Sequence, residues 1–213
     1  MSPAIPTPLP QSPKLLKLAV LASGKGSNLV AIADAIAQGR LNAVIQVVIF
    51  NNPDAGVRQK AKDYGLATAL LNHRTFESRE ALDRAIIETV TAYGADWIIM
   101  AGWMRRVTEV LITAFPHRIL NIHPSLLPSF PGIRAVEQAL TAGIKITGCT
   151  VHYVELIVDS GPIVLQAAVS ILPSDTPATL QARIQVQEHR IYPAAIAIAG
   201  SQFQQSADSG TPN

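Results

Sequence analysis

Cysteine is almost absent from this chain of 213 residues, which contains only Cys149. A single thiol excludes an internal disulfide and any metal site built from several cysteines, so we expect no metal. No apolar run reaches the ~18 residues that a membrane span needs. Lys and Arg are dispersed rather than clustered with aromatic residues, which argues against a nucleic-acid partner. The proline-rich start has no secretory signal, so the expected location is the cytoplasm.

The composition otherwise suits a folded domain with a sizeable core. Hydrophobic residues make up 48% of the chain and charged residues 15%, with a formal net charge of +2. We expect a disordered proline-rich leader over residues 1–13, one domain over residues 14–200, and a flexible polar tail over residues 201–213.

Strand-like and helix-like patterns alternate along most of the chain. Helical patterns separate the first five strand-like runs and recur at 136–142 and after Thr176, with Pro193 expected to kink or end the last helix. This repetition predicts an α/β fold, a mostly parallel, Rossmann-like sheet with helices on both faces. Strand-like runs lie at 15–22, 44–50, 67–71, 97–101, 118–121, 147–154 and 163–171.

The segment Leu120–Pro128 places an amide, an imidazole and a hydroxyl directly after a strand-like run. Alternation along a strand sends Asn121 and His123 to the same side, roughly 6.5–7 Å apart. The prolines that follow stop regular structure, so both side chains are expected at the carboxyl end of a strand, where parallel sheets build their sites. The alternative is a turn in which Asn and His only satisfy the loop backbone.

A glycine loop, Gly24–Asn28, lies between the first strand and the first helix. It lacks the third glycine of a dinucleotide fingerprint, where Leu29 stands, and the spacing of a P-loop. Two interpretations remain: a phosphate cradle formed by helix N–H groups, or a plain strand–helix turn.

Asp159 precedes Ser-Gly-Pro between the last two strand-like runs. An Asp there is usually a turn former, but the predicted fold returns this loop to the edge that holds Asn121 and His123. Carboxylate and imidazole together can manage a proton near neutral pH. His152 is interpreted as a core or supporting residue, and the histidines show no paired metal-ligand spacing.

The combination of motifs resembles the folate-dependent glycinamide ribonucleotide formyltransferases over residues 17–199. The motifs agree in order and spacing, and jointly they are specific. They are Ser23–Asn28, Ser78–Glu80, Ala101–Arg105, Leu120–Pro128, Gly148–Tyr153, Asp159–Pro162 and Gln187–His189.

The resemblance implies a formyltransferase fold and direct transfer of a formyl group from N10-formyltetrahydrofolate, a cosubstrate, to the amine of glycinamide ribonucleotide. Asn121, His123 and Asp159 carry over as the catalytic set. Asn121 and protonated His123 suit donation to a tetrahedral oxyanion. Asp159 suits stabilisation of the imidazolium and proton transfer from the attacking amine to the departing nitrogen.

The resemblance also implies two binding regions. The substrate-binding residues are Gly26, Ser27, Asn28, Gln185, Val186, Gln187 and Glu188. The residues expected to bind the folate are Arg79, Met104, Arg105, Arg106, Val107, Asn121, Glu155, Leu156, Ile157, Val158 and Asp159.

The chain departs from many relatives at Val136, where a His is common, and at Arg134, and the loop 155–158 is more apolar than usual. Three alternatives remain: a formyltetrahydrofolate hydrolase, a formyltransferase with another amine acceptor, or a non-catalytic nucleotide-binding module. The expected partners are small-molecule substrates, and the expected assembly is a monomer or a weak homodimer.

Overall fold

The computed structural model describes Ser12 and residues 14–209, so most of the expected leader lies outside the described residues. Within them, seven strands form one sheet in the order β3-β2-β1-β4-β5-β6-β7. The first five strands run parallel, and β6 and β7 each pair antiparallel to the preceding strand. The predicted mostly parallel α/β sheet is confirmed. The strands are β1 (Leu16–Ala22), β2 (Ala43–Phe50), β3 (Thr68–Leu70), β4 (Trp97–Met100), β5 (Ile119–His123), β6 (Ile146–Tyr153) and β7 (Ile163–Ser170).

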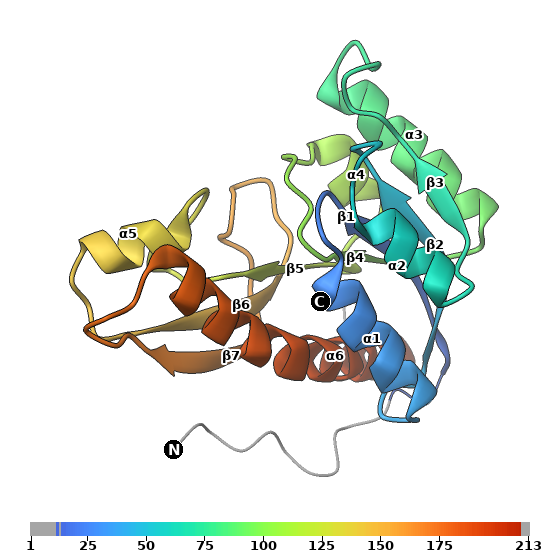
Figure 1. The fold of residues 1–213 in the computed structure, drawn as a ribbon. Helices are drawn as coiled ribbons and strands as arrows, with labels where there is room; N and C mark the ends of the chain where they lie inside the picture. The colour runs from blue at the N-terminus through green and yellow to red at the C-terminus, as the bar shows by residue number, and fades with distance from the viewer. Residues whose placement is uncertain (1–11, 13, 210–213) are drawn as a thin grey trace.

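Helices cover both faces of the sheet (Figure 1). One apolar core joins the sheet to α1, α2, α5 and α6, and a second core joins its other face to α3 and α4. Two-sided burial explains why β1 and β4 read as nearly continuous apolar runs. The helices are α1 (Ser27–Ala37), α2 (Val57–Asp63), α3 (Arg79–Ala92), α4 (Glu109–Ala114), α5 (Ala135–Thr141) and α6 (Pro177–Ser209).

The strand order reverses between β1 and β4, because β2 lies on one side of β1 and β4 on the other. At such a reversal the loops after the two strands diverge and leave room for a ligand. Here Ser23 joins the two loops: its N–H donates to the Gly102 carbonyl at 3.0 Å, and its Oγ accepts from the Met104 N–H at 2.8 Å. The loops after β1 and β4 therefore form one connected rim.

The long helix α6 is pinned beneath this edge of the sheet by Tyr192. The side chain is fully buried, and its hydroxyl lies 3.0 Å from the Met100 carbonyl and 3.2 Å from the Leu120 carbonyl. Met100 is the last residue of β4 and directly precedes the loop after that strand, and Leu120 directly precedes Asn121 on β5. Burial, with a smaller contribution from the charge of Glu188, raises the pKa of Tyr192 well above its ordinary value, so the hydroxyl stays a donor.

Two expectations for the end of the chain need correction. Pro193 lies inside α6 and does not end it. Residues 201–209 of the expected tail continue the same helix, and Ser201 is buried. Phe203 contacts Trp97 edge-on at 5.6 Å between ring centroids, and the Arg118 guanidinium lies 5.7 Å from the centroid of its ring. The packing of Phe203 against Trp97 and Arg118 stabilises this part of the helix, although the segment is mostly polar.

Among the described residues, none of the helices combines the length and the hydropathy needed to cross a membrane. This includes α6, whose 33 residues are amphipathic rather than uniformly apolar.

Candidate active site

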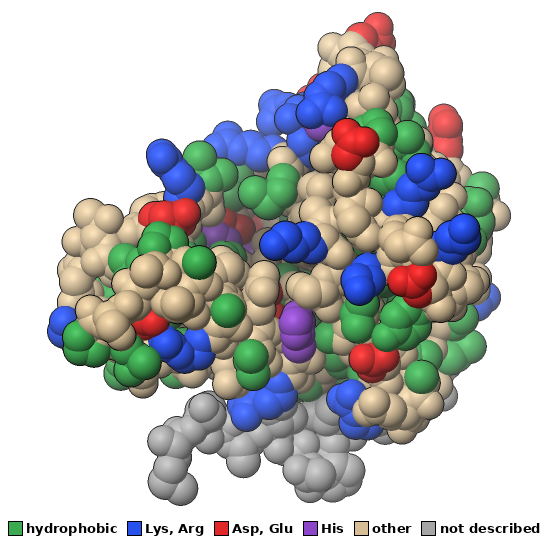
Figure 2. Space-filling view, viewed as in Figure 1, with side chains coloured by type: hydrophobic (Ala, Val, Ile, Leu, Met, Phe, Trp, Pro, Cys, Tyr) green, Lys and Arg blue, Asp and Glu red, His purple; other side chains and the backbone are tan. Residues whose placement is uncertain are grey.

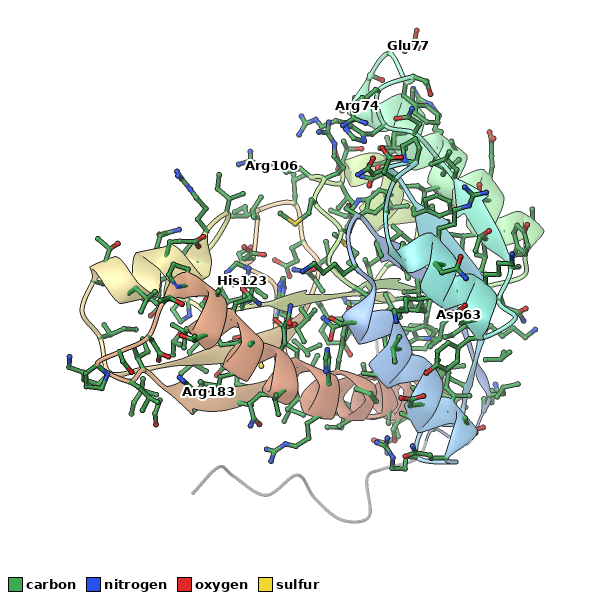
Figure 3. The ribbon with its side chains drawn as sticks, viewed as in Figure 1. Asp63, Arg74, Glu77, Arg106, His123 and Arg183 are labelled. Atoms are coloured by element: carbon green, nitrogen blue, oxygen red, sulfur yellow. The ribbon has the colours of Figure 1, made fainter. Side chains whose placement is uncertain are left out.

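Asn121 and His123 lie on β5 and share one side of the strand, as alternation predicts. His123 is 5% exposed, and Asn121 is partly buried. Figure 3 shows His123 beside β5, between the part of the molecule that carries α5 and the part that carries α3. The polar side chains therefore lie at the carboxyl edge of the parallel sheet.

Asp159 reaches this edge from the loop between β6 and β7. Its Oδ2 lies 3.3 Å from His123 Nδ1 and accepts the Gly132 N–H at 2.7 Å. The backbone of Asp159 is left-handed, with φ of 56°, a conformation that Asp tolerates better than most residues. The structure thus brings together Asn121, His123 and Asp159, the three residues singled out from the sequence.

The carboxyl group of Asp159 is held as an anion. Burial alone would raise its pKa, but hydrogen bonds from His152 and the Gly132 N–H, with the positive charges of His123 and His152, outweigh burial and lower the pKa below its ordinary value. Its side chain is 8% exposed, so this charge lies in a setting where solvent screens it weakly.

His152 belongs to the same cluster as a supporting residue, one of the two roles interpreted from the sequence, although the sequence did not reveal its partners. Antiparallel pairing sets His152 of β6 directly opposite Asn121 of β5. Its Nδ1 donates to the Tyr153 carbonyl at 2.8 Å, which leaves Nε2 to accept from Asn121 Nδ2 at 3.2 Å when the ring is neutral. Asp159 Oδ1 lies 3.5 Å from the same Nε2, so a protonated ring would instead donate to the carboxylate. The register between β5 and β6, which local sequence patterns do not reveal, brings His152 opposite Asn121.

The second ring nitrogen of His123 is also occupied. Its Nε2 lies 2.8 Å from the Phe130 carbonyl oxygen, and a carbonyl can only accept, so Nε2 carries a proton. Phe130 lies in a loop with three left-handed residues, Phe130, Gly132 and Arg134. The loop therefore contacts His123 through one carbonyl and Asp159 through one N–H.

The glycine loop packs against the start of α2. Gly26 is the N-cap of α1, with φ of 79°, and a Cβ at this position would lie 2.8 Å from Val57 Cγ2. Only glycine fits both the conformation and the space. The first N–H groups of α1 are thereby left at the carboxyl edge of β1, where they suit an anion.

Helix α6 faces this loop through Glu188. Asn28 Nδ2 donates to Glu188 Oε2 at 2.9 Å, which joins segments 160 residues apart. Burial raises the pKa of Glu188, opposed by the Asn28 hydrogen bond. Asn28 Oδ1 and Gln187 Oε1 are buried without a hydrogen-bond partner in the described part of the chain, an arrangement that suits a polar ligand.

The other predicted residues of α6 divide between its faces. Gln185 lies one turn before Glu188 and is partly buried, so it shares that side of the helix. Val186 is 63% exposed, and two residues of separation turn it away from Glu188. The structure does not bring Val186 to the glycine loop.

The predicted folate-binding residues come from three loops around the same edge. Asp83 Oδ2 accepts the Thr108 N–H at 2.6 Å, which ties the first turn of α3 to the loop after β4. Arg79 on α3 and Arg105 on that loop are exposed. Met104 is 70% exposed, and Leu156 and Ile157 of the β6–β7 loop are 64% and 73% exposed. Arg106 is exposed, Val107 is partly buried, and Glu155 and Val158 are exposed.

Among the described residues, no group of three or more His, Cys, Asp or Glu side chains has the arrangement of a metal site. The cluster at the carboxyl edge is instead a connected set of hydrogen-bonding groups from β5, β6 and two loops.

Comparison with known proteins identifies the family and supports the fold. Residues 16–196 match the family model described as formyl transferase. The chain is 40% identical over 181 residues to phosphoribosylglycinamide formyltransferase of Escherichia coli K12, which covers 85% of each protein. A crystal structure of glycinamide ribonucleotide transformylase 1 from Symbiobacterium toebii superimposes with a TM-score of 0.87 at 47% identity, covering 88% of this chain and 89% of that chain.

The chain also resembles larger proteins. It is 42% identical over 189 residues to the trifunctional purine biosynthetic protein adenosine-3 of Bos taurus, covering 89% of this chain and 19% of that protein. It thus spans about a fifth of the length of such relatives.

The fold is that of a group-transferring α/β enzyme, and the chain belongs to the formyl transferase family, whose model matches residues 16–196. It is about 40% identical to the phosphoribosylglycinamide formyltransferases of Escherichia coli K12 and Bacillus subtilis, over most of both chains.

Proposed function

We propose that this chain transfers the formyl group of N10-formyltetrahydrofolate to the amine of 5′-phosphoribosylglycinamide, a step of de novo purine biosynthesis. The observation that carries the proposal is the convergence of Asn121, His123 and Asp159 at the carboxyl edge of the sheet. In a family of formyl transferases, this set supplies what acyl transfer to an amine needs: donors for an oxyanion and a route for one proton.

In the proposed reaction, the amine nitrogen forms a bond to the formyl carbon and the bond from that carbon to N10 of the folate breaks. Between these events the formyl oxygen carries negative charge in a tetrahedral intermediate. Asn121 has two side-chain N–H groups and at most one of them is engaged by His152, so at least one is available for this oxygen. His123, with the anionic Asp159 at 3.3 Å, provides a positive charge beside it.

The proton balance assigns Asp159 a second task. The attacking amine must lose one proton and N10 must gain one. An ionised Asp159 can accept the proton directly or through a water and pass it on. Because its pKa is lowered, Asp159 is ionised at neutral pH and acts as a base first. The chemistry requires no metal and no covalent enzyme intermediate.

The binding assignments follow from position. The N–H groups at Gly26, Ser27 and Asn28 would hold the phosphate, and Glu188, with Gln185 and Gln187, would meet the ribose hydroxyls or the amine. Burial of Glu188 and the two unpaired polar atoms beside it support this assignment.

The folate would lie between the start of α3, the loop after β4 and the loop between β6 and β7. Its carboxylate tail suits the guanidinium groups of Arg79 and Arg105. Its ring suits the apolar surface and the backbone groups between the loops at 104–107 and 155–158. Val186, which the resemblance assigned to substrate binding, is 63% exposed and turned away from Glu188, so it is left out of this proposal. A location in the cytoplasm and a monomer or weak homodimer belong to the same proposal.

The test is a stopped assay with N10-formyltetrahydrofolate, with and without the ribonucleotide, on the wild type and on Asp159→Asn. We expect folate product only with the ribonucleotide, and a loss of about 10²–10⁴-fold in kcat for the variant. The variant should keep the wild-type circular dichroism spectrum and bind both ligands.

Other outcomes discriminate between the alternatives. Equal folate release without the ribonucleotide would identify a hydrolase. Release that requires a different amine would identify another acceptor, and tight ligand binding without turnover would identify a binding module.

A further inference from the structure

His123 is held by more than its proposed catalytic partners. Its Nδ1 faces Asp159 at 3.3 Å, while its Nε2–H donates to the Phe130 carbonyl at 2.8 Å. The ring is 6% exposed, so little water competes for either nitrogen. Both groups are acceptors, so the protonated ring donates from both nitrogens, and the Phe130 carbonyl keeps a proton on Nε2 when the other proton is shared with Asp159.

A buried hydroxyl closes the turn that presents the Phe130 carbonyl. Ser125 is fully buried, and its Oγ donates to the Ser129 carbonyl at 2.5 Å and lies 3.4 Å from the Phe130 carbonyl. These contacts close the turn that carries the Ser129–Phe130 peptide. Without the hydroxyl, nothing else in the described residues hydrogen-bonds the Ser129 carbonyl.

The base of the same turn is fixed to the antiparallel strands. The Thr150 hydroxyl donates to the Ser125 carbonyl at 2.7 Å and accepts the Leu127 N–H at 3.1 Å. Gln166 Nε2 donates to Thr150 Oγ1 at 2.9 Å and to the Leu127 carbonyl at 3.0 Å. A continuous set of hydrogen bonds thus leads from β7 through β6 and Ser125 to the turn that contacts His123.

We propose that Ser125 is a positioning residue for formyl transfer, because its hydrogen bond to the Ser129 carbonyl closes the turn that presents the Phe130 carbonyl as the resting acceptor of His123 Nε2–H. With that proton fixed on Nε2, His123 Nδ1 is the nitrogen that gains and loses a proton beside Asp159. The catalytic part of this inference rests on the proposed formyl transfer, whereas the position of the proton does not.

The resting hydrogen bond also has a consequence for the reaction. With Nδ1 turned to Asp159, the only N–H that His123 can offer to a formyl oxyanion is Nε2–H. The oxyanion then takes the place of the neutral Phe130 carbonyl. A hydrogen bond to an anion is roughly twice as strong as one to a neutral oxygen, so this exchange favours the transition state over the ground state. Ser125 keeps the N–H formed and oriented until the exchange.

The primary experiment is ¹⁵N NMR of the five histidines in the ligand-free protein, with His123→Asn used to assign the His123 signals. Above the titration of the ring, we expect the wild type to show the Nε2–H form of His123. Signals of the Nδ1–H form in the wild type would overturn the proposal, whatever any variant does.

The second experiment compares Ser125→Ala with Thr147→Val. Thr147 is another buried hydroxyl on β6, and its Oγ1 has no hydrogen-bond partner in the described residues. Loss of the Ser125 hydroxyl should mix the two proton positions on His123 and lower kcat about tenfold or more, with both KM values within roughly twofold. Thr147→Val should leave the spectrum and kcat as in the wild type.

Ser125→Cys provides a variant of similar volume with a weak donor, in case the alanine variant does not fold. It should show the same direction of change in the spectrum and in kcat. Unchanged spectra and turnover in a folded Ser125 variant would overturn the role of Ser125. A wild type that shows the Nε2–H form but no turnover with the ribonucleotide would contradict the proposed function alone.

Discussion

Glu188 illustrates, at the scale of one residue, how a ligand-binding group can oppose stability. It is 5% exposed, and Asn28 is the one side chain in the described residues that donates to it. Since burial raises its pKa, ionisation of Glu188 is less favourable in the folded chain than in the unfolded chain. Ionised Glu188 therefore lowers the free energy of unfolding at pH values above the raised pKa that the residue has in the folded chain. This loss of stability disappears as the pH falls towards the pKa of an unfolded Glu, about 4.3.

We therefore predict that Glu188→Gln melts at a higher temperature than the wild type at pH 8, with a smaller difference at pH 5. The amide oxygen can still accept from Asn28, so the change removes the charge and keeps the hydrogen bond. Turnover should suffer in return, with KM for the ribonucleotide raised about tenfold, the effect of one charged hydrogen bond.

Thermal melts at the two pH values and steady-state kinetics check this prediction. Glu77→Gln is the control, because Glu77 is an exposed residue at the far tip of the molecule near α3 (Figure 3). It should change neither the melting temperature nor KM. A Glu188→Gln variant that is less stable than the wild type at both pH values would contradict the argument.

At the scale of elements, the pairing of β6 with β7 decides whether the site can form, since β6 carries His152 and Thr150. The two strands approach so closely at Gly148 that a Cβ there would lie 1.9 Å from the Ala167 carbonyl oxygen. Backbone cannot give way as a flexible side chain can. Gly148→Ala must therefore separate the strands or tilt one of them.

We predict that Gly148→Ala costs about 3 kcal/mol of unfolding free energy, which corresponds to a fall of roughly 6–12 °C in Tm for a domain of this size. Chemical denaturation and calorimetry measure it. Gly24→Ala is the matched control for stability, because a Cβ added at Gly24 would meet nothing within 4 Å and the backbone there is not left-handed. Its Tm should stay close to that of the wild type, and a similar loss in both variants would refute the steric explanation.

The elements also indicate what the sequence could and could not reveal. The positions of the strands, the parallel order and the shared side of Asn121 and His123 follow from local periodicity, which short-range physics determines. The sequence left His152 as either a core or a supporting residue, because its contacts with Asn121 and Asp159 depend on the register between β5 and β6, a long-range pairing. The contacts of the Phe130 carbonyl and the Gly132 N–H depend on left-handed loop residues, and backbone groups leave no trace in residue type.

The prediction for the end of α6 was wrong for a related reason. Residues 201–209 are polar on average, and Pro193 suggests an earlier stop, so local rules predict a loose tail. The structure extends the helix because Phe203 packs on Trp97 and Arg118, two residues from distant parts of the sequence. Tertiary contacts override propensity at this point.

At the scale of the whole molecule, the net charge is nearly balanced, but one side of the surface carries an excess of positive charge. The formal net charge is only +2, yet four arginines are exposed around the start of α3 and the end of β4. They are Arg74, Arg79, Arg105 and Arg106. Figure 2 shows Lys and Arg side chains gathered along this upper side, and Figure 3 places Arg74 and Arg106 there, above His123. Such a surface attracts an anionic ligand over a distance set by salt.

We predict that KM for N10-formyltetrahydrofolate rises several-fold between 0.1 M and 1 M NaCl, as the Debye length shrinks from ~10 Å to ~3 Å, whereas kcat changes little. Arg105→Ala should raise KM at low salt and reduce its dependence on salt, because the variant has lost part of the attraction that salt screens. Lys145→Ala should behave as the wild type, since Lys145 precedes β6 at the end opposite to His152. Steady-state kinetics across the salt series decide the matter: equal salt dependence in the wild type and in Arg105→Ala would mean that this face of the molecule does not guide the folate to the site.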